Sequence, residues 1–272
     1  MIRSVKGGSA LAVRAYRAFC IVMHLFAGLS EVAVLFPFYG KGARNRAIGR
    51  WSARLLAILQ VRLTVTGSPP VEAQRPLVLV ANHVSWLDIQ IIHAVWQVRF
   101  VAKSEVRRWP LIGWLSAHTG TLFIERGKGR HAARINRSIH SAFQQDDAIG
   151  IFPEGSTTDG RQLARFHASL LQPAVDEGAI VCPAALRYRD AAGNVNVAAS
   201  YVGDTTLSQS LALILAQKRI FADLIFLPAI DAAGKSRREL AAQAHAAIAA
   251  ALNLPVADRQ PDRSAGPPGE PR

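Results

Sequence analysis

Apolar stretches of strand length and of helix length alternate along residues 61–252, and this alternation constrains the fold more than any other feature. Leu77–Ala81 is an unbroken apolar run bounded by Pro76, which is typical of a buried strand. Residues 89–98 follow as an apolar stretch of helix length. Further strands are predicted at 62–66, 99–102, 121–124, 149–152, 179–187, 195–201 and 224–227, and further helices at 109–117, 130–145, 168–177, 207–218 and 237–252. The alternation predicts an α/β domain with a mostly parallel central sheet flanked by helices.

The N-terminal 60 residues have a different character, and we expect them to form membrane-docking helices. Cys20–Tyr39 is almost wholly apolar over the length of a membrane span, although Glu31 interrupts it. Trp51–Leu63 combines apolar and basic residues in a pattern that suits an interfacial amphipathic helix. The pair is therefore predicted to span the bilayer or to lie in its interface; the alternative is a core helix of a soluble protein.

The charge distribution supports a membrane partner. The chain has a formal net charge of +13, and residues 1–60 hold nine bases and one acid. This excess beside the most apolar segment favours an anionic lipid surface. Nucleic acid is not predicted as a partner, because there is no zinc-finger spacing, no helix-turn-helix pattern and no basic stretch interleaved with aromatic residues. The tail, residues 253–272, is rich in Pro, Gly and charged residues and is predicted to be disordered.

Several common catalytic motifs are absent from the sequence. It contains no G-x-S-x-G, no G-x-x-x-x-G-K-[ST], no G-x-G-x-x-G and no H-E-x-x-H. The sequence therefore does not predict a serine hydrolase, a nucleotide-hydrolysing enzyme, a dinucleotide enzyme or a zinc peptidase of these types. Two cysteines, Cys20 and Cys182, are too few for a disulfide framework.

A polar segment, Asn82–Asp88, joins the strand at 77–81 to the next helix. His83 is expected at the strand end and Asp88 in the first helical turn, where open α/β sheets bind their ligands. A carboxylate within reach of a histidine fixes its tautomer and stabilises the imidazolium, so the two residues are a candidate general-base pair. Alternatively, Ser85-x-x-Asp88 only caps the helix, and His83 is a loop histidine.

Two other predicted strands end in polar residues. Arg126 follows the strand at 121–124, and Glu154 with Gly155 follows the strand at 149–152. A base, a cation and a hydroxyl-binding carboxylate are the groups needed to activate an alcohol on a substrate that carries an anionic group.

Together these blocks resemble the glycerophospholipid acyltransferase family over roughly residues 61–230. The resemblance is carried by Asn82-His83-(x)4-Asp88 combined with Phe152-Pro153-Glu154-Gly155, and by Lys103-Ser104-Glu105 after the third strand. It implies a glycerol-3-phosphate acyltransferase-like fold. It also implies transfer of a fatty acyl group from acyl-CoA or acyl-carrier protein to a lysolipid hydroxyl, with no cofactor and no metal.

The resemblance assigns roles to individual residues. His83 would be the general base, and Asp88 would hold its ring. The residues expected to bind the acceptor are Lys103, Arg126, Glu154, Gly155, Ser156 and Thr157; for Glu154 the alternative is that it braces the site. The expected location is the inner membrane with the catalytic domain facing the cytoplasm, and the expected partners are the bilayer, the lysolipid and the acyl donor.

One departure from the family pattern concerns the acceptor. The block commonly reads F-P-E-G-T-R-S, and its arginine is usually assigned to the acceptor phosphate; here Thr157 occupies that position, although Arg161 and Arg165 lie nearby in sequence. The first expectation is 1-acylglycerol-3-phosphate. The alternative is lyso-ornithine lipid, which lacks a phosphate and whose acyltransferases are similar here, including Asp159-Gly160. Thioester hydrolysis and a catalytically silent membrane scaffold are further alternatives.

Overall fold

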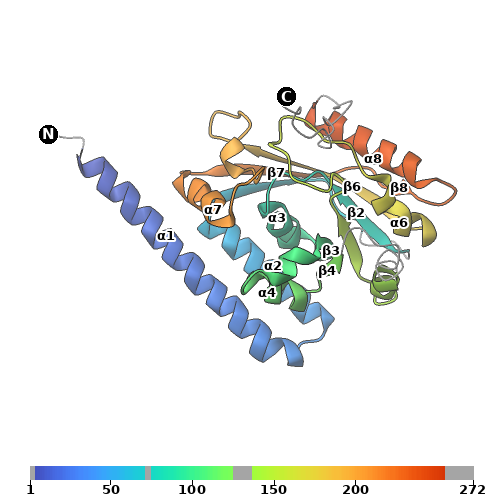
Figure 1. Cartoon of the computed structure of the whole chain (residues 1–272), viewed down its shortest axis with the longest axis horizontal. Helices are drawn as coiled ribbons and strands as arrows, with labels where there is room; N and C mark the ends of the chain where they lie inside the picture. Colours follow the sequence, from blue (N-terminus) through green and yellow to red (C-terminus); the bar gives the residue numbers. More distant parts are fainter. Residues whose placement is uncertain (1–3, 71–74, 125–136, 255–272) are drawn as a thin grey trace, which may run out of the picture.

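An eight-stranded sheet separates two layers of helices (Figure 1). The computed structural model describes residues 4–70, 75–124 and 137–254. The strands are β1 (Val61–Thr66), β2 (Leu77–Ala81), β3 (Val98–Lys103), β4 (Leu122–Ile124), β5 (Ala148–Ile151), β6 (Ile180–Arg189), β7 (Ile220–Phe226) and β8 (Ile230–Asp231). Their order is β1-β7-β6-β2-β5-β3-β4, and β8 pairs with β6.

The sheet is mostly parallel, as the sequence predicts. Strands β6, β2, β5, β3 and β4 all run in one direction. β7 lies antiparallel to β6 and carries β1 in parallel, and β8 is also antiparallel to β6. Because the parallel strands end at the same edge, the segments after β2 and β5 come together there.

Two helices precede the first strand in sequence, and the others lie between or after the strands. They are α1 (Ser4–Ser30), α2 (Lys41–Ile58), α3 (Leu87–Val95), α4 (Ile112–His118), α6 (Gln172–Asp176), α7 (Leu207–Ala216) and α8 (Arg237–Leu252), with a further helical segment at 137–143. A π-helical turn η1 (Glu31–Leu35) and a 3₁₀ turn η2 (Phe36–Phe38) extend α1. Other short 3₁₀ segments are η3 (Ser104–Arg108), η4 (Ala168–Leu171) and η5 (Val197–Ala199).

Both faces of the sheet are buried, which explains the unbroken apolar run at 77–81. Leu79 packs with residues of α2, α3 and α7 on one face. Val78 and Val80 pack with residues of α8 and α6 on the other. Figure 1 shows α8 on the opposite side of the sheet from α3 and α7. Alternate residues of each central strand therefore serve two separate cores.

Some sequence-based boundaries need correction. The strand predicted at 195–201 is wrong: Val195 forms a single bridge to Arg189, and residues 197–199 form η5. The Asp190 carboxylate accepts N–H bonds from Ala192 and Asn194, which holds a tight turn after β6. Pairing with β6 then stops because Ala199 N and Ser200 N bond locally to the carbonyls of Asn196 and Val197. The helix predicted at 51–63 is α2, which begins ten residues earlier.

The N-terminal α1 carries a largely unburied apolar surface. The stretch Leu11–Phe38 is long and apolar enough to cross a membrane. Phe19 and Phe26 are more than half exposed, and Phe38 is 84% exposed. Against α2, the bare Cα of Gly28 lets the Trp51 indole approach closely, and Trp51 Nε1 donates to the His24 carbonyl at 3.2 Å.

Arg17 attaches α1 to the α/β domain. Its side chain is buried, and its Nε and Nη2 donate to the carbonyls of Ile58 and Leu59 at 3.1 and 2.8 Å. Its Nη1 donates to the carbonyls of Leu215 and Gln217 at 3.1 and 3.0 Å. The guanidinium thus satisfies the C-terminal carbonyls of α2 and α7 together, where a positive charge is favourable.

Candidate active site

The amide of Asn82 fixes the point where the chain leaves β2. Its Nδ2 donates to the Leu186 carbonyl at 2.9 Å, and its Oδ1 accepts from the Leu186 N–H at 2.7 Å. β6 continues beyond the end of β2, so this side chain bonds to β6 as another strand residue would. The start of the polar segment is therefore held to the sheet.

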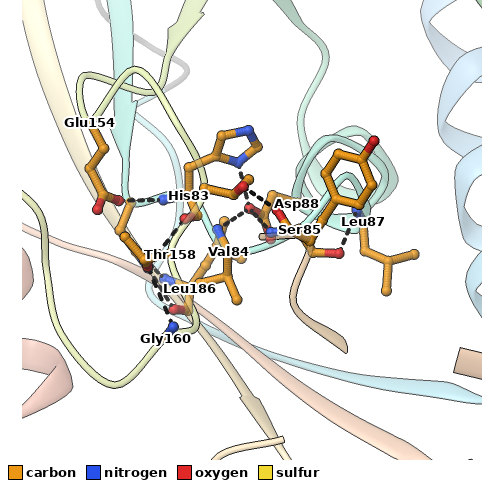
Figure 2. Close-up of polar contacts among 12 residues, drawn as sticks. His83, Val84, Ser85, Leu87, Asp88, Glu154, Thr158, Gly160 and Leu186 are labelled. Atoms are coloured by element: carbon orange, nitrogen blue, oxygen red, sulfur yellow. Dashed lines mark hydrogen bonds and ion pairs between the residues drawn. The ribbon is translucent and has the colours of Figure 1, made fainter. Parts of the chain in front are cut away.

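His83 and Asp88 form the expected pair. His83 Nδ1 lies 2.8 Å from Asp88 Oδ2, and the carboxylate has no exposed surface (Figure 2). Oδ2 also accepts the N–H groups of Val84 at 2.7 Å and Ser85 at 2.9 Å. An ionised carboxylate can only accept, so Nδ1 carries the imidazole proton and Nε2 is left to accept one.

The capping interpretation of Ser85-x-x-Asp88 holds in part. Asp88 accepts the Ser85 N–H, as in a capping box, but the Ser85 hydroxyl accepts from Leu87 N at 3.3 Å instead of from Asp88 N. The N–H of Asp88 bonds to the Ser85 carbonyl at 3.1 Å. One carboxylate therefore both organises the loop before α3 and holds the imidazole.

An aromatic stack sets the plane of the His83 ring. The imidazole lies on Phe152 with ring centroids 4.0 Å apart and planes 9° apart. Phe152 in turn lies on Phe100 at 5.2 Å and 4°. Gly150 makes room for Phe100, because a Cβ there would lie 2.7 Å from its ring. The His83 side chain remains 20% exposed, so a substrate can reach it.

Glu154 braces the site from the other side of His83 (Figure 2). Its Oε1 accepts the His83 N–H at 2.6 Å, and its Oε2 accepts the Ala164 N–H at 2.9 Å. Burial raises the pKa of this carboxyl to about 8. The turn that follows requires glycine, because Gly155 has a φ of +71°. With both oxygens bonded to the main chain, the geometry favours bracing by Glu154 over direct contact with the acceptor.

Three loops are bonded together around the His83 main chain. Thr158 N donates to the His83 carbonyl at 2.8 Å, and Tyr201 N donates to the Val84 carbonyl at 2.9 Å. The Thr157 hydroxyl donates to the Tyr201 carbonyl. Thr157 therefore uses its hydroxyl to join the loop after β5 to the loop before α7.

The structure brings together part of the predicted site. His83, Asp88, Glu154, Gly155 and Thr157 lie in the connected network, and Ser156 is exposed on the same turn. Arg126 lies outside the described residues, as does the side chain of Lys103 at the end of β3. The proposed roles of all eight residues remain predictions.

Sequence reasoning missed Tyr188 on β6. Its buried hydroxyl donates to Asp88 Oδ1 at 2.6 Å. The one available signal is the strand period, which places Tyr188 on the same face as Leu186.

Among the described residues, no three His, Cys, Asp or Glu side chains are grouped so as to hold a metal ion.

The fold is an α/β protein with a partly exposed imidazole backed by a buried carboxylate at the carboxyl edge of a mostly parallel sheet, which makes this pair a candidate general-base site. A family model described as Acyltransferase matches residues 62–187. The lyso-ornithine lipid O-acyltransferase of Pseudomonas aeruginosa is 39% identical over 222 residues, covering 82% of this chain and 84% of that protein. The 1-acyl-sn-glycerol-3-phosphate acyltransferase of Neisseria meningitidis serogroup B is 37% identical over 196 residues, covering 72% and 76%.

A solved structure shows the same fold. The 1-acyl-sn-glycerophosphate acyltransferase of Thermotoga maritima superimposes with a TM-score of 0.62 at 20% identity, over 90% of this chain and 95% of that one. The chain belongs to the acyltransferase family that includes the 1-acylglycerol-3-phosphate and lyso-ornithine lipid acyltransferases.

Proposed function

We propose that this protein transfers a fatty acyl group from acyl-CoA or acyl-carrier protein to a free hydroxyl of a lysolipid, with His83 as general base. The observation that carries the proposal is the 2.8 Å contact between His83 Nδ1 and the fully buried carboxylate of Asp88. It leaves Nε2 of a partly exposed ring as the proton acceptor.

The reaction follows from that geometry. Nε2 of His83 takes the proton of the acceptor hydroxyl as its oxygen attacks the thioester carbonyl, and Asp88 stabilises the imidazolium. The carbon–sulfur bond then breaks, and the leaving thiolate takes the proton from the imidazolium. A positioned base of this kind contributes typically about 10²–10⁴-fold to the rate. No covalent enzyme intermediate and no cofactor takes part.

For the acceptor, we propose a lyso-ornithine lipid. Family prevalence alone puts 1-acylglycerol-3-phosphate first, and the Neisseria relative keeps it as the second candidate. At residue 157, however, the chain has a hydroxyl that bonds to the Tyr201 carbonyl, where a phosphate-binding arginine is usual. The Pseudomonas relative, which matches over most of both chains, carries the lyso-ornithine name.

The reaction is proposed to take place at the cytoplasmic face of the inner membrane. Both acyl donors are cytoplasmic, and the lysolipid resides in the bilayer. The exposed apolar surface of α1 supports membrane attachment, as does the basic surplus beside it, since each basic residue near an anionic surface contributes about 1 kcal/mol.

The test is acyl transfer by the purified full chain in detergent or vesicles, with labelled acyl-CoA and acyl-carrier protein against lyso-ornithine lipid and 1-acylglycerol-3-phosphate. His83→Ala should abolish transfer and leave the protein folded. His140→Ala is the matched control, since His140 is exposed and pairs with Glu177 away from the site.

The outcomes separate the alternatives. Thiol release that does not need a lysolipid would indicate a hydrolase, and no release with any donor would indicate a scaffold. An active His83→Ala variant would overturn the mechanism. Higher kcat/KM with 1-acylglycerol-3-phosphate would reverse the proposed acceptor.

A further inference from the structure

Tyr188 completes the hydrogen bonding of Asp88 on the side away from His83. It lies on β6, where it pairs with Ala222 of β7, and the residue is 2% exposed. Its hydroxyl donates to Asp88 Oδ1 at 2.6 Å, whereas Oδ2 is the oxygen that faces His83. Each oxygen of the carboxylate therefore has its own donors, from segments 100 residues apart in the chain.

We propose that Tyr188 is a positioning residue for acyl transfer. Its hydroxyl holds Asp88 so that Oδ2 stays directed at His83. The same hydrogen bond determines how readily His83 is protonated. The proposal rests on the proposed function, because it takes His83 as the general base.

The positioning role follows from the freedom of a carboxylate to turn about its Cβ–Cγ bond. A donor that holds Oδ1 opposes that rotation. Asp88 has no exposed surface, so removal of the Tyr188 hydroxyl would leave Oδ1 buried without its donor. Burial and the neighbouring Asp88 charge raise the pKa of Tyr188 well above its ordinary value, so the hydroxyl stays protonated and able to donate.

The effect on His83 has a definite sign. A hydroxyl bonds more strongly to a carboxylate whose charge is not already shared with an imidazolium. The Tyr188 bond thus favours the state in which His83 is neutral. Without it, His83 holds its proton more readily, and the acid side of the pH profile of kcat/KM must move to higher pH. Glu154, which accepts the His83 N–H and whose pKa is raised to about 8, is present in both proteins, so the difference between wild type and variant isolates the loss of the Tyr188 hydroxyl.

The experiment compares Tyr188→Phe with Ser210→Ala. Ser210 lies on α7 and accepts from Trp86 Nε1 at 3.1 Å, at the start of the same helix that carries Asp88. Ser210→Ala removes a buried hydrogen bond beside α3 but leaves the bonds of the Asp88 carboxylate intact. This variant therefore controls for a non-specific loss of packing around α3.

In Tyr188→Phe we expect kcat to fall by about tenfold. The KM for the lysolipid and the KM for the acyl donor should each stay within about twofold of the wild-type value. The acid-side midpoint of kcat/KM should rise in this variant and stay unchanged in Ser210→Ala. Wild-type kcat and pH profile in Tyr188→Phe, or the same shift in both variants, would overturn the proposal. If His83→Ala stayed active, the general-base mechanism on which this proposal rests would fail, which is a separate result.

A second probe keeps the shape of the side chain. Incorporation of 3-fluorotyrosine at position 188 makes the hydroxyl a stronger donor of almost the same size. The acid-side midpoint should then move to lower pH, opposite to the shift in Tyr188→Phe. An unchanged midpoint in a folded fluorinated protein would overturn the proposal even if Tyr188→Phe failed to fold.

Discussion

The Glu154 carboxyl should make the free energy of unfolding fall as pH rises. Burial raises its pKa from 4.5 to about 8 in the folded protein. Between those values the unfolded chain loses the proton and the folded protein keeps it, so each pH unit lowers stability by about 1.4 kcal/mol. The contribution is complete below pH 4.5 and is lost by about pH 8, a total of about 5 kcal/mol.

The variant Glu154→Gln isolates this effect because glutamine does not titrate. Its oxygen can still accept the His83 N–H, but its amide nitrogen cannot accept the Ala164 N–H. That mismatch costs about 1–3 kcal/mol at every pH. The wild type should therefore be more stable at pH 5 and the variant more stable at pH 8, with the two curves crossing between about pH 5 and 7.

The assay is urea unfolding in detergent, followed by tryptophan fluorescence, from pH 5 to 8.5. The informative quantity is the difference in free energy of unfolding between wild type and variant, in which other titrating groups cancel. A difference that stays constant across this range would refute the reasoning, because it would mean that Glu154 is ionised in the folded protein throughout.

Three other substitutions test separate parts of the structure. Arg17→Met removes four hydrogen bonds to helix-end carbonyls and should lower the free energy of unfolding by about 3–5 kcal/mol in the same urea assay. Arg14 is exposed, so the control Arg14→Met should change this free energy by less than about 0.5 kcal/mol. Phe152→Leu removes the ring on which the imidazole rests; kcat should fall by about tenfold at unchanged KM, and a larger change in KM than in kcat would contradict the positioning role. Thr157→Arg should raise kcat/KM for 1-acylglycerol-3-phosphate relative to lyso-ornithine lipid by at least about tenfold, and an unchanged ratio in the acceptor panel would show that residue 157 does not select the acceptor.

Local patterns were sufficient to predict the best-defined elements. The helix predicted at 237–252 coincides with α8, whose start is fixed by a capping box between Ser236 and Glu239. The strand before His83 and the helix after it were predicted because apolar runs and a polar junction lie within a few residues of each other. The His83–Asp88 contact is likewise local, since it spans five residues.

Features that depend on distant contacts could not be predicted. The bond from Tyr188 to Asp88 and the tie between Asn82 and Leu186 each join residues about a hundred positions apart. The reversed direction of β7 leaves no mark on its apolar pattern, because parallel and antiparallel central strands bury the same residues. Thr157 could be recognised as a departure from the family block, but its Tyr201 partner is visible only in three dimensions.

The contacts of Arg17 have a consequence for how the protein is made. Arg17 is synthesised well before two of its acceptors, which lie 198 and 200 residues further along the chain. Segments that come earlier in a chain are synthesised earlier, so α1 is complete while Leu215 and Gln217 are still untranslated. α1 is thus made before α7 but completes its contacts only after α7 has folded. Until then Arg17 can bond to the carbonyls of Ile58 and Leu59, and its Nη1 lacks the carbonyls of Leu215 and Gln217.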